Sequence, residues 1–165
     1  MINTRIPGAY VKTWEEFEFT TGALKALCRF ASFFDHIIII TNQQGVGKGL
    51  MTAEKLDEIH DQLKKQIQEA GGRIDAIYAC TELKSEDSNC RKPSPAMALW
   101  AKMKYPEIDF AKSIMIGDSL SDMEFGGNLG MYSVFVEGKQ EEAEEAETLK
   151  VDLRIKKLAD FSSFL

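Results

Sequence analysis

The chain has 165 residues, of which 44% are hydrophobic, enough for one domain built around a single core. Its formal net charge of −6 argues against tight contact with nucleic acid or an anionic membrane and favours a small-molecule partner. No apolar run approaches the roughly 20 residues that span a bilayer, and no signal-like segment opens the chain. We therefore expect a single cytoplasmic domain over residues 1–165, with no separate cap domain.

The first half of the chain alternates helical and strand patterns. Apolar residues recur every three or four positions over residues 20–34, which predicts a helix capped by one of the two threonines at its start. Residues 36–40, HIIII, form a β-branched run typical of a strand covered on both sides. Thr52 is expected to cap a long amphipathic helix over residues 52–70, and a second strand is expected over residues 74–80.

The second half continues the alternation. We expect a helix over residues 95–105, a strand over 113–116, a short helix over 122–129 and a strand over 132–136. Residues 151–165 are expected to add a short strand and an end helix. The acidic run EEAEEAE before them is interpreted as a solvated helix face or a disordered stretch. Alternating strands and helices joined by short turns predict an α/β fold, a doubly wound parallel sheet in three α/β/α layers.

Polar residues follow three of the predicted strands. Thr41 begins TNQQGVGKG after the first strand, Arg91 and Lys92 lie in CRKP after the second, and Asp118 and Asp122 lie in GDSLSD after the third. Ligands of open parallel sheets bind beyond the carboxyl ends of the strands, so these side chains should converge on one rim. A hydroxyl, a lysine and a metal-binding carboxylate are the groups that phosphoryl transfer uses.

Each of these features also has an ordinary structural explanation. A lone threonine at a strand end is commonly a turn or cap residue, a Lys-Pro pair is commonly a loop, and Gly-Asp is a frequent turn. Turns alone do not readily explain all three placements together. The glycine-rich QGVGKG is not a P-loop, because Gly49 stands where that motif requires serine or threonine.

Five segments together resemble a known family. They are YV, FEF, TNQQGVGKG, CRKPSPAM and GDSLSDMEFGGNLG, between about residues 2 and 136. They resemble the haloacid dehalogenase (HAD) superfamily of phosphohydrolases, and within it the subgroup of histidinol-phosphate and D-glycero-D-manno-heptose 1,7-bisphosphate phosphatases. The resemblance implies a Rossmann-like core and a small phosphorylated substrate of the sugar phosphate or histidinol phosphate class.

The resemblance also implies roles for particular residues. Thr41 is similar to the hydroxyl that binds the transferring phosphoryl group, and Lys92 to the lysine that stabilises it. Asn42 and Arg91 are similar to residues that contact the substrate or its phosphate.

The carboxylates of the third segment are implied to serve a metal. Asp118 is similar to the family's Mg²⁺-binding acid, with Asp122 supporting the metal or the lysine. The implied cofactor is therefore Mg²⁺.

One part of the family pattern has no counterpart. The family attacks the phosphoester with an aspartate, forming an aspartyl-phosphate that water then hydrolyses, and a second aspartate two residues later acts as general acid and base. This chain begins MINTRIPGAYV and lacks the Asp-x-Asp-Gly motif of the first, central strand. We expect that strand and both aspartates to lie upstream of Met1, as in a truncated or mis-started reading frame. The chain as given is then expected to be inactive or severely impaired.

The cysteines depart from the subgroup as well. Many members carry a zinc site of the form Cys-x-His plus Cys-x-Cys before Arg-Lys-Pro. This chain keeps Cys80 and Cys90 but has Glu82 and Ser88 at the other two positions. Two thiolates do not close a tetrahedral site, so zinc is not expected. With Cys28, the chain has three cysteines, which we interpret as free thiols in a reducing compartment.

Three functions remain open from the sequence. The first is a Mg²⁺-dependent small-molecule phosphatase. The second is a polynucleotide 3′-phosphatase, against which the acidic balance argues because that substrate demands a cationic groove. The third is a catalytically dead phosphate-binding or interaction domain that truly lacks its nucleophile.

Overall fold

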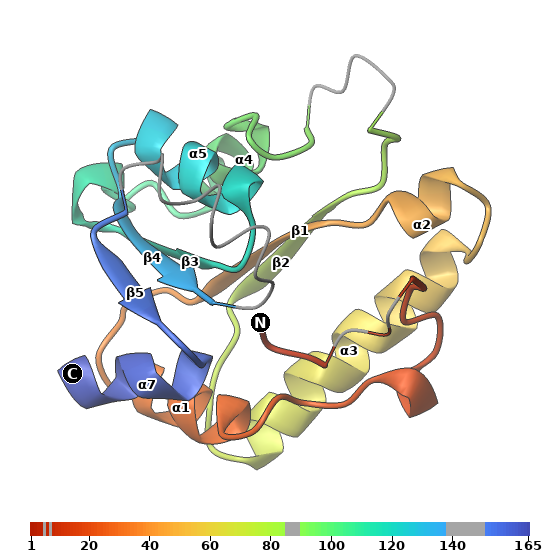
Figure 1. The fold of residues 1–165 in the computed structure, drawn as a ribbon, viewed down its shortest axis with the longest axis horizontal. Helices are drawn as coiled ribbons and strands as arrows, with labels where there is room; N and C mark the ends of the chain where they lie inside the picture. The colour runs from red at the N-terminus through yellow and green to blue at the C-terminus, as the bar shows by residue number, and fades with distance from the viewer. Residues whose placement is uncertain (5, 7, 85–89, 138–150) are drawn as a thin grey trace.

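Helices cover both faces of a parallel β-sheet that is divided into two parts (Figure 1). No helix in the described ranges is both long and apolar enough to cross a bilayer. The acidic run EEAEEAE lies outside these ranges. The computed structural model describes residues 1–4, 6, 8–84, 90–137 and 151–165.

The first part of the sheet has two strands. β1 (Ile38–Asn42) pairs in parallel with β2 (Ala76–Cys80). Both strands end at the same edge, because Asn42 lies opposite Cys80 in the register. The loops that follow β1 and β2 therefore leave the sheet side by side.

The second part has three strands in the order β3-β4-β5. β3 (Ile114–Gly117) pairs with β4 (Tyr132–Val136), and β4 pairs with β5 (Leu153–Ile155), all in parallel. The predicted parallel α/β fold is thus confirmed, with its sheet in two pieces.

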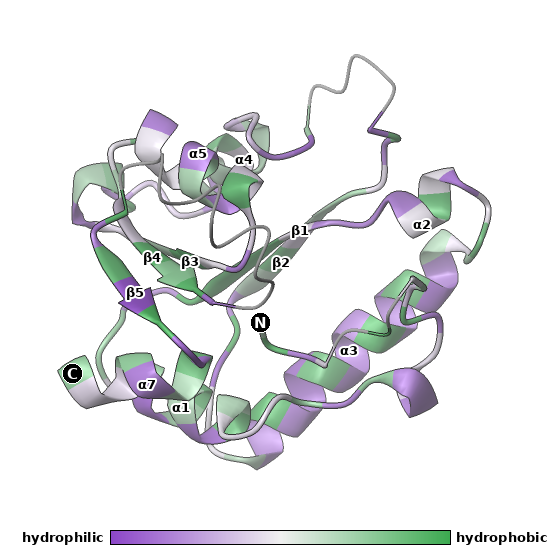
Figure 2. Cartoon of the chain, viewed as in Figure 1, coloured by the Kyte–Doolittle hydropathy of each residue, from purple (hydrophilic) through white to green (hydrophobic). Residues whose placement is uncertain are grey.

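One face of the sheet is covered by α1 (Ala23–Phe30), α3 (Ala53–Glu69) and α7 (Leu158–Phe161). Apolar and polar residues alternate along α3, as expected for a helix with one buried face (Figure 2). These helices and the strands enclose the main core. Its buried residues are Ala23, Ala26, Leu27, Phe30, Leu63, Ile67, Val134, Val136, Ile155, Leu158 and Phe161.

The other face is covered by α4 (Ala96–Lys104) and α5 (Leu120–Asn128). The one-turn helix α2 (Gln44–Gly47) follows β1 at the edge of the sheet. With helices on both faces, the predicted three layers are present. Three 3₁₀ segments complete the described elements: η1 (Trp14–Glu16), η2 (Phe110–Lys112) and η3 (Ser162–Phe164).

β1 is not covered as its sequence predicts. All five of its residues are half-buried, whereas four of the five residues of β4 are buried. Among the described strands, β1 pairs only with β2 and β3 pairs only with β4, so each has one edge without a strand. The prediction that β1 is fully covered is wrong, because among the described strands β1 has a partner on one edge alone.

Of the two threonine helix caps that the sequence predicts, one is correct and one is wrong. Thr52 caps α3, as predicted, and its Oγ1 accepts a hydrogen bond from the Lys55 N–H at 3.2 Å. The predicted threonine cap of α1 is wrong, because Gly22 occupies that position with a left-handed φ of 81°. A Cβ at this glycine would lie 2.8 Å from the Ala159 Cβ, so close packing against α7 also requires glycine.

Candidate active site

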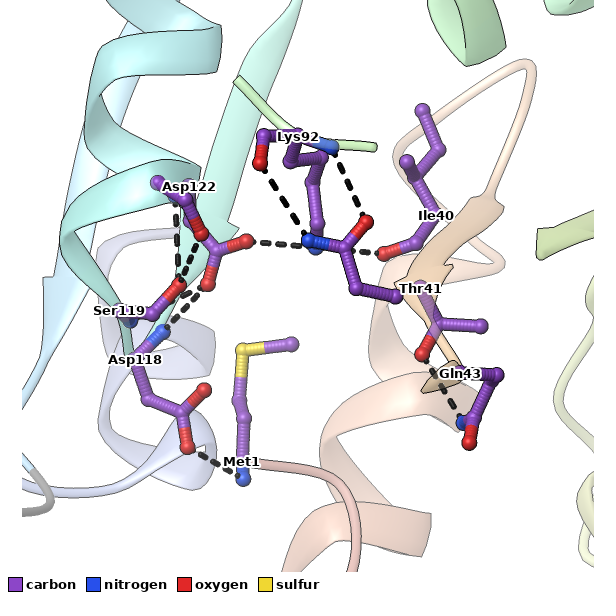
Figure 3. Close-up of polar contacts among 10 residues, drawn as sticks. Met1, Ile40, Thr41, Gln43, Lys92, Asp118, Ser119 and Asp122 are labelled. Atoms are coloured by element: carbon purple, nitrogen blue, oxygen red, sulfur yellow. Dashed lines mark hydrogen bonds and ion pairs between the residues drawn. The ribbon is translucent and has the colours of Figure 1, made fainter. Parts of the chain in front are cut away.

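Lys92 links the two parts of the sheet at their carboxyl ends (Figure 3). Its ammonium donates to the Ile40 carbonyl of β1 at 2.8 Å and pairs with the Asp122 carboxylate of α5 at 2.5 Å. The side chain of Lys92 is 10% exposed and that of Asp122 is 6% exposed. Because buried charges are costly unless they are paired, these contacts hold the ammonium at the rim.

The last residue of β1 holds the Lys92 loop in turn. The Lys92 N–H donates to Asn42 Oδ1 at 3.0 Å, and Asn42 Nδ2 donates to the Lys92 carbonyl at 3.4 Å. The neighbouring Thr41 accepts a hydrogen bond from Gln43 Nε2 at 3.1 Å (Figure 3). The structure thus brings Thr41, Asn42 and Lys92 together at one rim, as expected.

The loop after β3 is ordered by Asp122. Its Oδ2 accepts from the N–H groups of Asp118 and Ser119, both at 3.1 Å, and Ser119 Oγ accepts from the Asp122 N–H at 3.3 Å. Asp122 and Ser119 form a capping box that begins α5. A Cβ at Gly117 would lie 2.2 Å from that of Asp122, so only glycine allows this approach. Asp122 therefore contacts the lysine, the second of its two expected roles.

Asp118 already has a cationic partner. Its Oδ2 accepts a hydrogen bond from the Met1 ammonium at 3.0 Å (Figure 3). Carboxylate oxygens are the ligands that Mg²⁺ prefers, and this oxygen is half-buried rather than fully solvated. Asp118 therefore holds a positively charged group at the rim.

The segment before Lys92 is tied to β2 by a disulfide bond. Cys80 ends β2, and its Cα lies 5.6 Å from that of Cys90, within the range that a disulfide spans. The prediction of free thiols is wrong for these two cysteines and correct for Cys28. Glu82 offers an oxygen within 4.8 Å of both sulfurs, but the sulfurs are bonded to each other and are not thiolates. Ser88 lies outside the described residues.

A second polar group was not predicted from the sequence. The Tyr10 hydroxyl accepts hydrogen bonds from Gln44 Nε2 at 3.0 Å and Lys48 Nζ at 3.2 Å. The hydrogen bond from Lys48, that from Gln44 and the positive charges of Lys48 and Arg91 together lower the pKa of this phenol below its usual value. Contacts between residues 34 to 38 positions apart leave no periodic signal in the sequence.

Comparison with known proteins agrees with this geometry. A family model for HAD-hydrolase-like proteins matches residues 89–161. A D-glycero-alpha-D-manno-heptose-1,7-bisphosphate 7-phosphatase from Mycobacterium bovis is 39% identical over 129 residues, which cover 78% of this chain and 68% of that protein. A phosphatase of the same name from Campylobacter jejuni is 33% identical over 153 residues, covering 92% and 86%.

Solved structures give the same result. The crystal structure of the D,D-heptose 1,7-bisphosphate phosphatase from B. bronchiseptica, complexed with magnesium and phosphate, superposes with a TM-score of 0.88. The match covers 99% of this chain and 91% of that one at 27% identity. The chain therefore belongs to the haloacid dehalogenase superfamily, in the family of the heptose-1,7-bisphosphate phosphatases.

Proposed function

We propose that the chain forms the greater part of a Mg²⁺-dependent phosphatase that acts on a phosphorylated sugar of the heptose bisphosphate class. The observation that carries this proposal is the rim itself, where Thr41, Lys92 and Asp118 lie beyond or at the carboxyl ends of three parallel strands. The relatives named above are phosphatases of this class, and one of them was crystallised with magnesium and phosphate.

Each residue has a chemical task in this proposal. The Thr41 hydroxyl donates a hydrogen bond to an oxygen of the transferring phosphoryl group, and the Lys92 ammonium neutralises charge that develops there. Asn42 holds the Lys92 loop, and Arg91 contacts the substrate. Asp118 would hold Mg²⁺, which when bound supplies positive charge next to the phosphate. Asp122 pairs with the Lys92 ammonium and holds it in place.

The nucleophile is proposed to lie on a further strand between β1 and β3. Support comes from β1 and β3, each of which has one edge without a partner among the described strands. A parallel strand placed there would end at the rim, where the Met1 nitrogen lies 3.0 Å from the Asp118 carboxylate. A segment that precedes Met1 could thus form this strand and carry the Asp-x-Asp pair at its end.

A direct assay tests the proposal. The 165-residue chain and a version extended upstream through an Asp-x-Asp-Gly strand would be incubated with Mg²⁺ and a panel of phosphoesters that includes heptose bisphosphate. Released phosphate should be detected only with the extended protein, and chelation of the metal should abolish it. Robust hydrolysis by the chain as given would show that the nucleophile has been misplaced.

Matched variants of the extended protein assign the roles. Lys92→Ala and Asp118→Asn should each lower the rate at least about 100-fold, because they remove charge stabilisation and a metal ligand. Lys112→Ala is the control, since that side chain is exposed and pairs only loosely with Asp109, at 3.8 Å. An equal loss in all three variants would mean that the assay reports folding and not chemistry.

A domain that binds phosphate without turning it over is the second candidate. The observation that favours it is that Asp122, one of the two carboxylates of the motif, is already paired with the Lys92 ammonium. In that case the extended protein would bind phosphate but release none from any ester.

A further inference from the structure

The disulfide bond joins the end of β2 to the loop that carries Lys92. Cys80 is the last residue of β2, and Cys90 lies two positions before Lys92 in the chain. Both cysteines are buried, Cys80 completely and Cys90 at 7% exposure, and they pack in one cluster with Met97 of α4. The bond therefore fixes the position of the Lys92 loop from the side of β2.

Hydrogen bonds from the end of β1 hold the same loop. Asn42 lies opposite Cys80 in the register of the two strands, and its side chain makes two hydrogen bonds to the backbone of Lys92. One of these two is long, at 3.4 Å, and is therefore weak. The Gln43 N–H donates to the Cys80 carbonyl at 2.6 Å, so the segment after β1 is tied to the same cysteine. Release of Cys90 would thus leave the weak clamp of Asn42 to hold the Lys92 backbone against β1.

Glu82 gives the two sulfur atoms a polar neighbour. One oxygen of its carboxylate lies within 4.8 Å of both sulfurs. Its Oε2 is buried and accepts no hydrogen bond from the residues that the structure describes. A buried acceptor without a donor is costly, and a disulfide has no proton to offer it.

Reduction of the disulfide would supply a donor. A reduced cysteine carries an S–H group, which is a weak hydrogen-bond donor. Once the bond between the sulfurs is broken, each side chain is free to rotate toward the Glu82 carboxylate. Glu82 therefore stabilises the reduced form relative to the oxidised form, and the bond is reduced more readily than it would be in an apolar setting.

We propose that the bond between Cys80 and Cys90 is a reversible redox switch that controls how firmly Lys92 is held at the rim. A small dithiol is the reductant. One of its thiolates attacks Sγ of Cys90, the more exposed of the two cysteines, and Cys80 leaves as a thiolate that takes up a proton. The second thiol of the reductant then attacks the mixed disulfide, so that Cys90 leaves as a thiol and the reductant departs as a cyclic disulfide. Two electrons and two protons pass to the protein.

NMR relaxation tests the switch without requiring turnover. The 165-residue chain with Cys28→Ser, which removes the third cysteine, would be measured before and after treatment with dithiothreitol. On reduction, the order parameter of the Lys92 N–H should fall from about 0.85 to below about 0.6, while that of Val134 in β4 stays near its starting value. Re-oxidation should restore the first value. An unchanged value at Lys92, or an equal fall at both residues, would overturn the switch.

The redox equilibrium tests the role of Glu82. The Cys28→Ser chain would be equilibrated with mixtures of reduced and oxidised dithiothreitol, and the oxidised fraction measured by mass after alkylation. Glu82→Leu should require about tenfold more reduced dithiothreitol for half reduction, because it removes the acceptor. Glu82→Gln keeps an acceptor oxygen and should shift the midpoint less, and Glu58→Leu, at a side chain that is 61% exposed, is the matched control. An unchanged midpoint in Glu82→Leu would remove the reason for ready reduction and overturn the proposal.

The extended protein connects the switch to catalysis. This step rests on the proposed function, in which Lys92 acts on the transferring phosphoryl group. Release of phosphate from heptose bisphosphate with Mg²⁺ should be at least about tenfold slower after reduction and should recover on re-oxidation, because Lys92 is less firmly positioned. Equal rates in the two forms would overturn the control of catalysis. Absence of hydrolysis in both forms, with the expected change at the Lys92 N–H, would overturn the proposed function and support the switch.

Discussion

The two parts of the β-sheet differ in how completely similar strands are buried. β4 has a strand on each side, and its Val134 and Phe135 are 0% exposed. β1 is at least as apolar at its start, but all its residues are half-buried because only β2 pairs with it. Burial of a parallel strand thus depends on both of its edges, and a run of isoleucines does not ensure it.

The comparison also explains where the candidate site lies. The open edges of β1 and β3 belong to different parts of the sheet, and the rim above them carries Thr41 and Asp118. Lys92 contacts both parts through Ile40 and Asp122. Lys92, one of the side chains proposed for catalysis, therefore also holds the two parts together.

Removal of Lys92 should have the largest effect on this arrangement. Lys92→Met leaves the Asp122 carboxylate buried without its cation, which should cost about 3 kcal/mol or more in the free energy of unfolding. Denaturant unfolding measures this loss. Lys112→Met should cost less than about 1 kcal/mol, because its ion pair is exposed. Similar losses in both variants would refute the bridging role.

Two isoleucines that contact the same core test the difference in burial. Ile155 of β5 is 5% exposed, whereas Ile39 of β1 is only partly buried against that core. Ile155→Ala should lower the free energy of unfolding by about 2 to 4 kcal/mol, and Ile39→Ala by roughly half as much. In the extended protein the two losses should become similar. A larger loss for Ile39 in the chain as given would contradict the open edge.

Reduction of the disulfide should lower the free energy of unfolding somewhat less, because the bond constrains only the β1-β2 part of the sheet. Cys80 and Cys90 are separated by ten positions in the sequence. Loop-closure entropy for such a loop predicts a loss of about 2 to 3 kcal/mol on reduction or in Cys80→Ser/Cys90→Ser. Urea unfolding with and without dithiothreitol measures it, with Cys28→Ser as the control. No change on reduction would show that the bond does not contribute to stability.

The smallest expected effect concerns the pH dependence of α3. Burial lowers the pKa of His60 below its usual value of 6.5, although the charges of Asp57 and Asp61 oppose this. The unfolded chain then takes up a proton more readily than the folded one, so stability should fall as pH drops below about 6.5. His60→Gln should make that fall shallower between pH 7.5 and 5.5. An unchanged slope would show that His60 makes no contribution.

Local sequence patterns predicted the elements but not their partners. β-branched runs located β1 and β4 within two residues, and Thr52 marked the start of α3 because its cap is a contact between neighbours in sequence. The disulfide and the contacts of Tyr10 depend on the meeting of distant segments, which no periodicity records. Gly22 replaced the predicted threonine cap because α7 packs too closely there for a side chain.

For the candidate site, too, the sequence predicted where residues lie but not which residues they contact. Strand ends and motif resemblance located Thr41, Lys92 and Asp118 at one rim, because parallel strands end at the same edge of a sheet. The pairing of Asp122 with Lys92 depends on how α5 sits against the Lys92 loop. That arrangement is tertiary, so the sequence left both roles of Asp122 open.

Amide hydrogen exchange tests the central claim most directly. The claim is that a strand carrying the nucleophile pairs between β1 and β3. In the chain as given, the N–H groups on the open edges of Ile38–Asn42 and Ile114–Gly117 should exchange rapidly, while those of Tyr132–Val136 are protected. In the extended protein the two open edges should become as protected as β4. Unchanged exchange on extension, or full protection of both edges in the chain as given, would contradict the account.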